Sequence, residues 1–450
     1  MRPRLFNPLR LNPTWLRYIT VEPALIFFAI SHILCDFLNT NLYLQKSCRD
    51  DKTREPDLNT FCDDERRGIT YVSWINTNFV CYKMILTVLC AALVTSWSDE
   101  AGRRRRPLIL LPIAGQILES ASGCVQSYFW HWSPIDAVVS NFIIHVLFGG
   151  MTLFGIGCYV YICETSSFEN RTMRLGIISA IKMVCTPVTN GFAGFVFRQI
   201  GFLHCYLLCL MFSLISMLYA VTFIRDTSVP IKTTSTVWKS FNLCKLPENF
   251  KVVFKKSLGQ KRIIVGILLM IQVLVVFATE GEKSIFYLYF RYGFKWDERT
   301  YGYYIAYKLV GVIVGTIFCS VILSRVYKIH DGLIGAFAGF WDTIAVLCYL
   351  NADQTWQLYT IPLLDIFHGA AKDAYGSFLS KFYSDDEFGR LSSVIMTFGL
   401  IVPICHPIYN TVFRSTMDYF PSAFFMISAI VDVLVCFLYG CTYVLSKKMI

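Results

Sequence analysis

Long runs of apolar residues recur along the whole chain, separated by polar segments. A helix that crosses a bilayer needs about 20 mostly apolar residues, because its backbone amides must bond within the segment where no water is present. Twelve runs have this length, so the pattern predicts twelve membrane-spanning helices. The predicted ranges are 20–44, 74–97, 107–128, 138–163, 174–198, 202–224, 262–289, 301–323, 332–350, 357–380, 391–414 and 420–445.

Composition agrees with a membrane protein and argues against a soluble enzyme. Of the 450 residues, 55% are hydrophobic and 16% are charged, whereas soluble domains are about 25% charged. The expected fold class is an all-α membrane protein. The sequence contains no H-E-x-x-H, P-loop or G-x-S-x-G motif, so we expect no catalytic residues, no metal and no cofactor.

Positive charge concentrates in alternate loops, which predicts the orientation of the helices. The connection 225–262 carries nine Lys/Arg against two acidic residues, a net charge of +7 (nine minus two). Loop 46–68 has six basic and seven acidic residues, a net charge of −1. We therefore predict that 225–262 and both termini are cytoplasmic and that 46–68 lies outside. The formal net charge of +10 is then explained by basic residues in the cytoplasmic loops, and we expect no nucleic-acid partner.

The basic connection divides the predicted helices into two sets of six. This organisation is typical of transporters built from two pseudo-symmetric bundles with a site at the membrane midplane. We predict an N-terminal bundle over 1–225, a cytoplasmic linker over 226–261 and a C-terminal bundle over 262–450. The repeat Gly311-xxx-Gly315 has the spacing at which small residues let two helices approach.

The most specific string, Ser96 to Pro107, follows the second run and resembles the major facilitator signature G-x-x-x-D-R-x-G-R-R. A glycine permits a tight reversal, an aspartate can accept from a neighbouring helix N-terminus, and arginines can pair with acids in one conformation only. The alternative is that the arginines only anchor the membrane face. The predicted conformational latch consists of Asp99, Gly102, Arg103, Arg104 and their candidate partner Glu164.

Several strings along the chain resemble solute carrier family 46, the family of the proton-coupled folate transporter. They are Val21-Glu22-Pro23, Phe294-Lys295-Trp296, Leu379-Ser380-Lys381, Asp386 to Arg390, Pro407 to Asn410 and Pro421 to Phe425. The resemblance implies the major facilitator fold, cytoplasmic termini, and a plasma-membrane or endolysosomal location. It also implies folates, anionic conjugates or bacterial cell-wall fragments as substrates, often driven by a proton gradient.

Two departures from the family pattern affect the expected chemistry. Ser179 stands where the folate carrier has its proton-coupling glutamate. Cys48 and Cys62 both fall in the predicted outer loop, where cysteines can pair or remain free. Lys295 replaces the family's extracellular cysteine beside the tryptophan, and by this resemblance a Cys48–Cys62 disulfide is favoured over a long-range one.

Charged residues inside the apolar runs are the candidates for the substrate pathway. A charge at the bilayer centre costs about 2.5–3.5 kcal/mol on insertion scales, so each one should face a cavity or a partner. Asp365, His368 and Lys372 follow at i, i+3 and i+7, which places them on one helix face. By analogy with the major facilitator fold, four further residues should line the cavity: Asp36, Lys83, Lys182 and Lys308.

These residues indicate how a solute could be moved. The lysines would attract an anion, while Asp365, Asp36 or His368 could carry a coupling proton. We also hypothesise an ion pair between Asp365 and Lys372.

The sequence thus predicts a secondary transporter that moves an organic anion by alternating access. We expect it to act as a monomer in a lipid bilayer, with a small solute and protons as its partners. The alternative is a receptor or scaffold without transport.

Overall fold

The computed structural model describes residues 20–49, 64–100, 104–166, 168–226, 261–380 and 401–447. The first part of the chain forms α1 (Glu22–Cys48), α2 (Glu65–Ile75), the π-helical turn η2 (Asn76–Val80), α3 (Cys81–Glu100), α4 (Arg106–Tyr128), α5 (Pro134–Phe148), α6 (Gly150–Thr165) and α7 (Phe168–Phe223).

The second part forms α10 (Lys261–Phe294), α11 (Glu298–Ile317), η5 (Phe318–Val326), α12 (Asp331–Leu350), α13 (Thr355–Leu364), η6 (Asp365–Phe367), α14 (His368–Ser380), η7 (Val402–Ile404), α16 (Cys405–Thr416) and α17 (Phe425–Lys447).

Helix is found in every predicted range, and the chain is a helical membrane protein in its described parts. Nine described helical stretches are long and apolar enough to cross a bilayer. One of them, within α7, holds two rods joined at Gly201, whose φ of 75° requires the left-handed freedom of glycine. This is the boundary predicted between ranges 174–198 and 202–224. The count of twelve remains a prediction, because part of 391–414 lies outside the described residues.

Two predicted ranges are interrupted in the middle. Range 138–163 is divided into α5 and α6 at Gly149 and Gly150, both with positive φ. Range 357–380 is divided at Asp365, three residues after Pro362 in α13. Proline removes a backbone donor from the last turn of α13, immediately before the second break. Both breaks occur next to titratable side chains that are described below.

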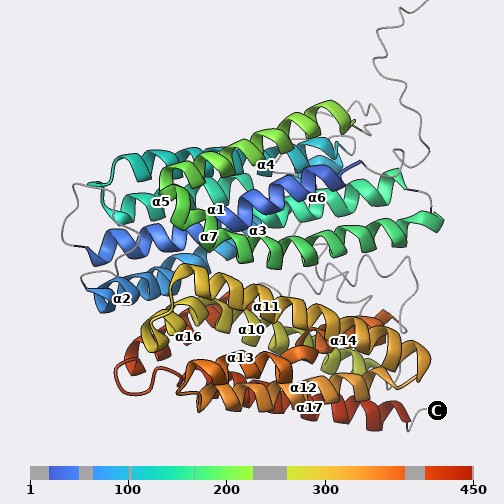
Figure 1. Ribbon diagram of the computed structural model, residues 1–450. Coiled ribbons are helices and arrows are strands. Elements are labelled where there is room, and N and C mark those ends of the chain that lie inside the picture. The colour runs from blue at the N-terminus through green and yellow to red at the C-terminus, as the bar shows by residue number, and fades with distance from the viewer. Residues whose placement is uncertain are drawn as a thin grey trace, which may run out of the picture.

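The helices gather in two groups that follow the order of the sequence (Figure 1). Helices α1–α7 form the N-terminal group and α10–α17 form the C-terminal group. Three buried clusters draw only on the first group and another only on the second. A further cluster joins the groups, since Leu44, Ile69 and Val72 pack with residues around Phe290. The arrangement agrees with the predicted two bundles, although the exact domain boundaries remain a prediction.

Contacts between the groups concentrate at one end of the molecule, which we call the junction end. Tyr287 donates to Asn41 Oδ1 at 2.6 Å, Ser73 donates to the carbonyl of Asn410 at 3.0 Å, and Arg66 pairs with Asp418 at 2.5 Å. Helix α7 lies against α11 there, because Gly194 faces the backbone of Glu298.

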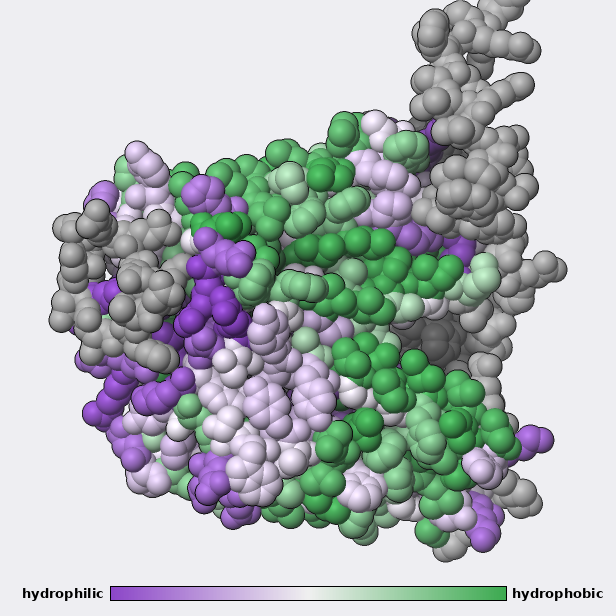
Figure 2. Space-filling model, in the orientation of Figure 1, coloured by the Kyte–Doolittle hydropathy of each residue, from purple (hydrophilic) through white to green (hydrophobic). Residues whose placement is uncertain are grey.

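At the other end, called the opposite end, no hydrogen bond or ion pair between two described residues joins the groups. In Figure 2 the groups meet under hydrophilic residues on the left.

A valine at Gly194 should separate α7 from α11. The added Cβ would collide with the carbonyl oxygen of Glu298, and overpacking of this kind costs about 1–3 kcal/mol. We expect a lower melting temperature and faster deuterium exchange in the first turns of α11. Gly176→Val is the matched control on the same helix, because nothing lies within 4 Å of its added Cβ. Equal behaviour of the two variants would contradict the close packing.

Candidate functional site

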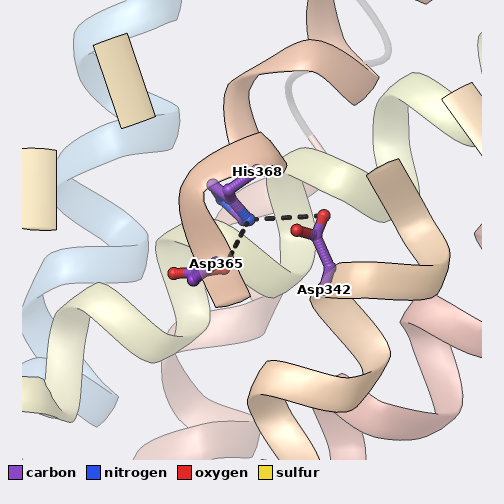
Figure 3. A group of neighbouring side chains, drawn as sticks. All are labelled: Asp342, Asp365 and His368. Atoms are coloured by element: carbon purple, nitrogen blue, oxygen red, sulfur yellow. Dashed lines mark ion pairs between the residues drawn. The ribbon is translucent and has the colours of Figure 1, made fainter. Parts of the chain in front are cut away.

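A cluster of ionisable side chains lies in the middle of the C-terminal group (Figure 3). Lys308 Nζ of α11 is 2.8 Å from Asp365 Oδ2 of η6. His368 Nδ1, at the start of α14, is 3.4 Å from Asp342 Oδ2 of α12 and 3.7 Å from Asp365 Oδ1. Asp342 and Asp365 are buried. The structure therefore brings together three of the predicted pathway residues and adds Asp342.

The break at η6 and close helix packing position this cluster. Gly315 of α11 lies directly against the carbonyl of Ile366, so a larger residue would push the two helices apart. The predicted small-residue spacing thus serves the approach of α11 to η6. Lys308 also lies over the rings of Phe286 and Tyr349, at 4.6 and 5.1 Å from their centroids. Such rings stabilise a buried ammonium by cation–π attraction.

Carboxyl groups outnumber bases in this region. The charges of Glu282 and Asp432 also act on the cluster. Four carboxyls then surround the Lys308 ammonium and the His368 imidazole, which gives a net charge of −2 (four minus two) if every group is ionised. Burying such an imbalance is costly, and binding protons relieves it. Chemically, the cluster can take up and release protons.

The same cluster has the spacing of a metal site. Ligand atoms of Asp342, Asp365 and His368 all lie within 4.8 Å of one another. The ammonium of Lys308, however, already lies at ion-pair distance from Asp365. We therefore interpret the group as an ion-pair and proton-binding cluster.

The hypothesised Asp365–Lys372 pair is wrong. Asp365 pairs with Lys308 instead, and no ion pair joins it to Lys372 among the described contacts. Residues seven apart on a helix share a face but are separated by about 10 Å along its axis. The i, i+7 spacing of Asp365 and Lys372 therefore did not predict the ion-pair partner of Asp365, which is Lys308.

The remaining predicted pathway residues are distributed over both groups and have no ion-pair partner among the described residues. The carboxylate of Asp36 is exposed, Lys83 and Lys182 are half-buried, and Lys372 is exposed. None of the four has an oppositely charged atom within 4 Å in the described part of the chain. The charges that act on Asp36 include Lys83 of its own group and Lys283 of the other. These side chains therefore sense one another across the gap.

A second polar network lies beside Asp36 and was not among the predicted site residues. His32 Nδ1 is 3.0 Å from Gln116 Oε1, and Glu119 lies 3.9 Å from His145 Nδ1. Asn39 donates to Glu119 at 3.2 Å. Lys283 and His406 approach from the C-terminal group, and both His406 nitrogens lack a hydrogen-bond partner. Polar residues inside apolar runs were the available signal, but the sequence did not show which of them meet.

Much of the predicted latch lies outside what the structure describes. This holds for Gly102, Arg103 and the side chain of Asp99. Arg104 is exposed and its backbone N–H donates to the carbonyl of Ser98 at 3.2 Å. The Arg105 guanidinium binds Glu164 at 2.7 Å, within the N-terminal group. Glu164, the candidate partner for the latch arginines, is thus paired within the N-terminal group. Its partner is Arg105, which was not among the predicted latch residues.

The disulfide prediction is observed at one of its two positions. Cys48 is disulfide-bonded, while the other cysteines in the described ranges form no disulfide. The expected partner, Cys62, lies outside the described residues, so the pairing remains a prediction. Cys48 is buried at the end of α1, where the bond can restrain the chain at the junction end.

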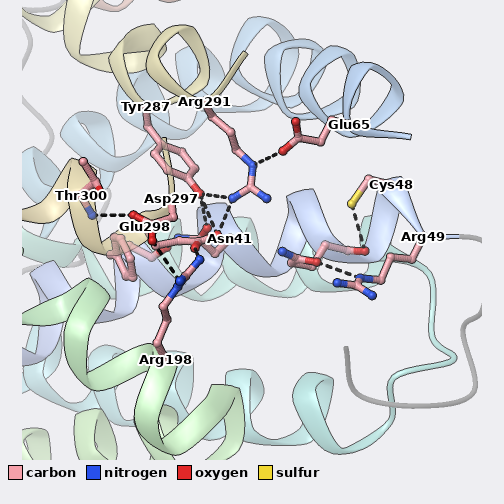
Figure 4. A network of polar contacts seen from close by, with 12 residues as sticks. Asn41, Cys48, Arg49, Glu65, Arg198, Tyr287, Arg291, Asp297, Glu298 and Thr300 are labelled. Carbon is pink, nitrogen blue, oxygen red and sulfur yellow. Dashed lines mark hydrogen bonds and ion pairs between the residues drawn. The ribbon is translucent and has the colours of Figure 1, made fainter. Parts of the chain in front are cut away.

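A buried ionic network ties the groups together at the junction end (Figure 4). Arg291 of α10 is 2% exposed; it lies 2.8 Å from Glu65 of α2 and bonds to Glu298 at the start of α11. Arg198 of α7 pairs with Asp297 at 2.9 Å and with Glu298 at 3.5 Å. Each arginine thus binds at least one acid of the opposite group, and both bind Glu298 of α11. Sequence reasoning missed the network, because its members lie at helix ends where charges usually face water.

Asp297, in the short loop before α11, is suited to hold this network closed. Burial alone would raise the pKa of its carboxyl, but hydrogen bonds from Thr300 and the charges of Arg198 and Arg299 lower the pKa below its ordinary value. The carboxylate therefore stays ionised in mildly acidic solution.

Comparisons with known proteins agree with this architecture. A family model for the Major Facilitator Superfamily matches residues 68–405. The human lysosomal proton-coupled steroid conjugate and bile acid symporter SLC46A3 is 23% identical over 438 residues, which cover 92% of each chain. The probable peptidoglycan muropeptide transporter SLC46 of Drosophila melanogaster is 19% identical over 366 residues, or 76% of this chain and 68% of that protein.

Solved structures show the same fold. The human organic anion transporter MFSD10 (TETRAN) superimposes with a TM-score of 0.64 at 15% identity, covering 95% of this chain and all of that one. A proton-dependent oligopeptide transporter gives a TM-score of 0.63 at 12% identity, with coverage of 96% and 99%. The chain belongs to the Major Facilitator Superfamily, as a multi-pass secondary transporter whose curated relatives are members of solute carrier family 46.

Proposed function

We propose that this chain is a proton-coupled carrier of organic anions, which pass between the two helix groups by alternating access. The observation that carries the proposal is the set of lysines without ion-pair partners between the groups: Lys83, Lys182 and Lys372. A lysine at membrane depth requires water or an anion. Lysines that have no described acid at ion-pair distance are therefore suited to receive an acidic solute.

The names of the relatives support the same class of solute. SLC46A3 proteins are named as symporters of steroid conjugates and bile acids, and the Drosophila relative as a probable muropeptide transporter. We propose a solute of this kind, with an acidic group attached to a larger body. Asp36, Lys83, Lys182 and Lys372 would line its path.

The cluster around Lys308, Asp365 and His368 is the proposed proton site. With Asp342, Glu282 and Asp432 included, it carries more carboxyls than bases. A proton bound there changes the local charge balance, and the occupancy of the site can then favour one conformation over another.

The arrangement supports a conformation open at one end. With the orientation predicted from the loops, the junction end faces outside and the opposite end faces the cytoplasm. The ionic network around Arg291 would close the outer side. We propose bundles over 1–225 and 262–450 joined by the linker 226–261, and a latch around Asp99, Gly102, Arg103 and Arg104 that forms when the cytoplasmic side closes.

We further propose that the protein acts as a monomer with cytoplasmic termini in an endolysosomal or plasma membrane. The SLC46A3 relatives are named as lysosomal proteins, which favours the endolysosomal alternative.

Saturable uptake is the direct test of transport. We expect proteoliposomes containing the full chain to accumulate a radiolabelled steroid sulfate, and Lys83→Gln to raise KM roughly tenfold, because one charge-assisted contact of about 1.5–3 kcal/mol is lost. Lys447→Gln, at the exposed end of α17, should leave KM unchanged. Binding without accumulation would support a receptor instead.

Asp365→Asn should remove the stimulation of uptake by external acid. The substitution leaves a group that cannot ionise beside Lys308, so protonation no longer changes the charge there. Uptake of the steroid sulfate would be measured across a pH series, with Asp353→Asn on an exposed loop as control.

A double variant, Lys308→Met with Asp365→Asn, tests whether a loss of acid-stimulated uptake in Asp365→Asn results from leaving Lys308 unpaired. An unchanged pH profile in both variants would remove Asp365 from the proton pathway.

Arg291→Met should weaken the closure of the junction end. Glu65 and Glu298 would lose a buried cation, and breaking a buried pair costs about 3–5 kcal/mol. We expect faster deuterium exchange in α2 and at the start of α11. Lys295→Met is the matched control, because its ammonium lies 3.5 Å from the same Glu65 but is 64% exposed. If deuterium exchange in Arg291→Met matched that in Lys295→Met, the ionic network would not be responsible for closing the junction end.

A further inference from the structure

A histidine and a buried carboxyl group meet in the N-terminal group, apart from the C-terminal cluster. His145 Nδ1 of α5 lies 3.9 Å from Glu119 Oε2 of α4. Asn39 of α1 donates to Glu119 Oε1 at 3.2 Å and accepts from the Tyr206 hydroxyl at 2.8 Å. Among the described residues, His145 is the one base at ion-pair distance of Glu119. The carboxyl group is therefore held between a neutral amide and a titratable imidazole.

Close packing holds Glu119 in place. It lies between Gly115 and Gly123 on one face of α4, since successive members of this set are four residues apart. A Cβ on Gly115 would collide with Phe148 of α5, and one on Gly123 would collide with Tyr206 of α7. The two glycines thus let α4 pack against both helices, and the carboxyl group is buried there.

The helix break after α5 gives the imidazole its place. A Cβ on Gly150, which has positive φ, would meet the His145 ring. The ring centroid of His145 lies 6.0 Å from that of His32 of α1, and His32 Nδ1 lies 3.0 Å from Gln116 Oε1 of α4. The His145 ring therefore lies between the break, α4 and α1.

The same network lies next to Asp36, a proposed pathway residue. His32 precedes Asp36 by four residues and Asn39 follows it by three, so all three share one face of α1. These two neighbours bind Gln116 and Glu119 of α4, while Asp36 is exposed. The pair of Glu119 and His145 is therefore one residue removed from the wall of the proposed path.

A matching pair lies in the C-terminal group (Figure 3). Asp342 of α12 lies 3.4 Å from His368, the first residue after η6. With α2–α3 and α11–η5 counted as single stretches, α4 and α12 are the third stretches of their groups, and α5–α6 and α13–α14 are the fourth. Each group thus sets a carboxyl group of its third stretch against a histidine beside the break in its fourth. Repeated halves are typical of transporters with a site between them.

The other titratable groups that face the pair come from the helices packed around it, and α6 contributes the backbone of Gly150. From the C-terminal group, Lys283, which is paired with Glu280, acts on Asp36. The charges of Asp36 and Lys83 are opposite in sign, so the local net charge follows the pair. The groups are His32, Cys35, Asp36 and Tyr43 of α1, Lys83 of α3 and Tyr206 of α7.

We propose that Glu119 and His145 form a second proton-binding site, which sets the affinity of the carrier for its anion. With a neutral imidazole the pair carries a charge of −1. One proton from solution, bound to a carboxyl oxygen or to the imidazole, brings this charge to zero. The anion then meets less negative charge beside its path. The inference rests on the proposed transport of anions and adds how acid strengthens the binding of the solute.

Thermodynamic linkage makes this effect reciprocal. If a proton raises the affinity for the anion, the anion raises the affinity for the proton by the same factor. Proton and solute therefore bind together on the acidic side of the membrane and leave together on the neutral side. The C-terminal cluster keeps its proposed role in turnover, so Asp365 should control the rate at saturating solute and Glu119 the dissociation constant.

Binding of a radiolabelled steroid sulfate to the full-length protein in lipid nanodiscs tests the second site. In the wild type we expect Kd to fall at least about fivefold between neutral and mildly acidic solution, which is the low end of typical coupling between sites. Glu119→Gln keeps an acceptor for Asn39 but cannot ionise. It should bind the probe at neutral pH about fivefold more tightly than the wild type, whereas a purely structural role of Glu119 would make binding weaker.

Two variants serve as controls for this measurement. Asp136→Asn, at the exposed start of α5, removes a carboxylate outside the network and should bind the probe as the wild type does. Asp365→Asn should keep the pH dependence of Kd, although it loses the acid stimulation of turnover at saturating solute. Adding Glu119→Gln to Asp365→Asn should then abolish the pH dependence of Kd.

Proton uptake in Asp365→Asn covers the case in which Glu119→Gln does not fold. Calorimetry of steroid sulfate binding in two buffers with different heats of ionisation counts the protons taken up with the anion. We expect proton uptake in Asp365→Asn, because the second site is intact. Binding of the anion without proton uptake in this variant would overturn the second site.

The outcomes separate the second site from the transport proposal. If the wild type accumulates the steroid sulfate but Glu119→Gln binds it no more tightly than the wild type at neutral pH, the second site is wrong and transport stands. If the wild type neither binds nor accumulates this probe or a bile acid, the transport proposal fails, and the second site with it.

Discussion

The cost of a charged side chain away from bulk water is the constraint that organises this protein. Each such group must find an opposite charge, an aromatic face or a path to water. Arg291 satisfies this with Glu65 and Glu298, and Lys308 with Asp365 and two aromatic rings. Lys83, Lys182 and Lys372 have no acidic oxygen within 4 Å among the described residues. The difference between paired and unpaired cations separates the structural charges from the proposed solute contacts.

Paired charges serve two different purposes in the two places where they gather. At the junction end, Arg291 binds Glu65 and Arg198 binds Asp297 and Glu298 across the two groups, so these bonds exist only while this end is closed. In the C-terminal group, the cluster is assembled from α11, α12, η6 and α14 of a single group, so it can persist while the groups move. A persistent cluster with excess carboxyls is suited to hold a proton through a conformational change.

Helix irregularity supplies the geometry for these roles. The break at Asp365 follows Pro362 and presents a carboxylate to α11, and Gly315 lets the backbones approach. The glycine break between α5 and α6 lies beside His145, which faces Glu119. Unwound backbone at membrane depth is tolerated where protein or water satisfies it. The same breaks therefore mark the places where ionisable side chains meet.

The sequence by itself determined that the chain is helical, crosses a membrane repeatedly and falls into two halves, because runs of about 20 apolar residues and the alternation of basic loops are local properties. It also indicated Lys308, Asp365 and His368, which the structure brings together. Only the tertiary structure decided their partners: Asp365 with Lys308 and not Lys372, Glu164 with Arg105, and Arg291 with Glu65 across the junction. Helix periodicity fixes the face of a side chain, but an ion pair depends on how separate helices are packed, and that information is spread over the whole chain.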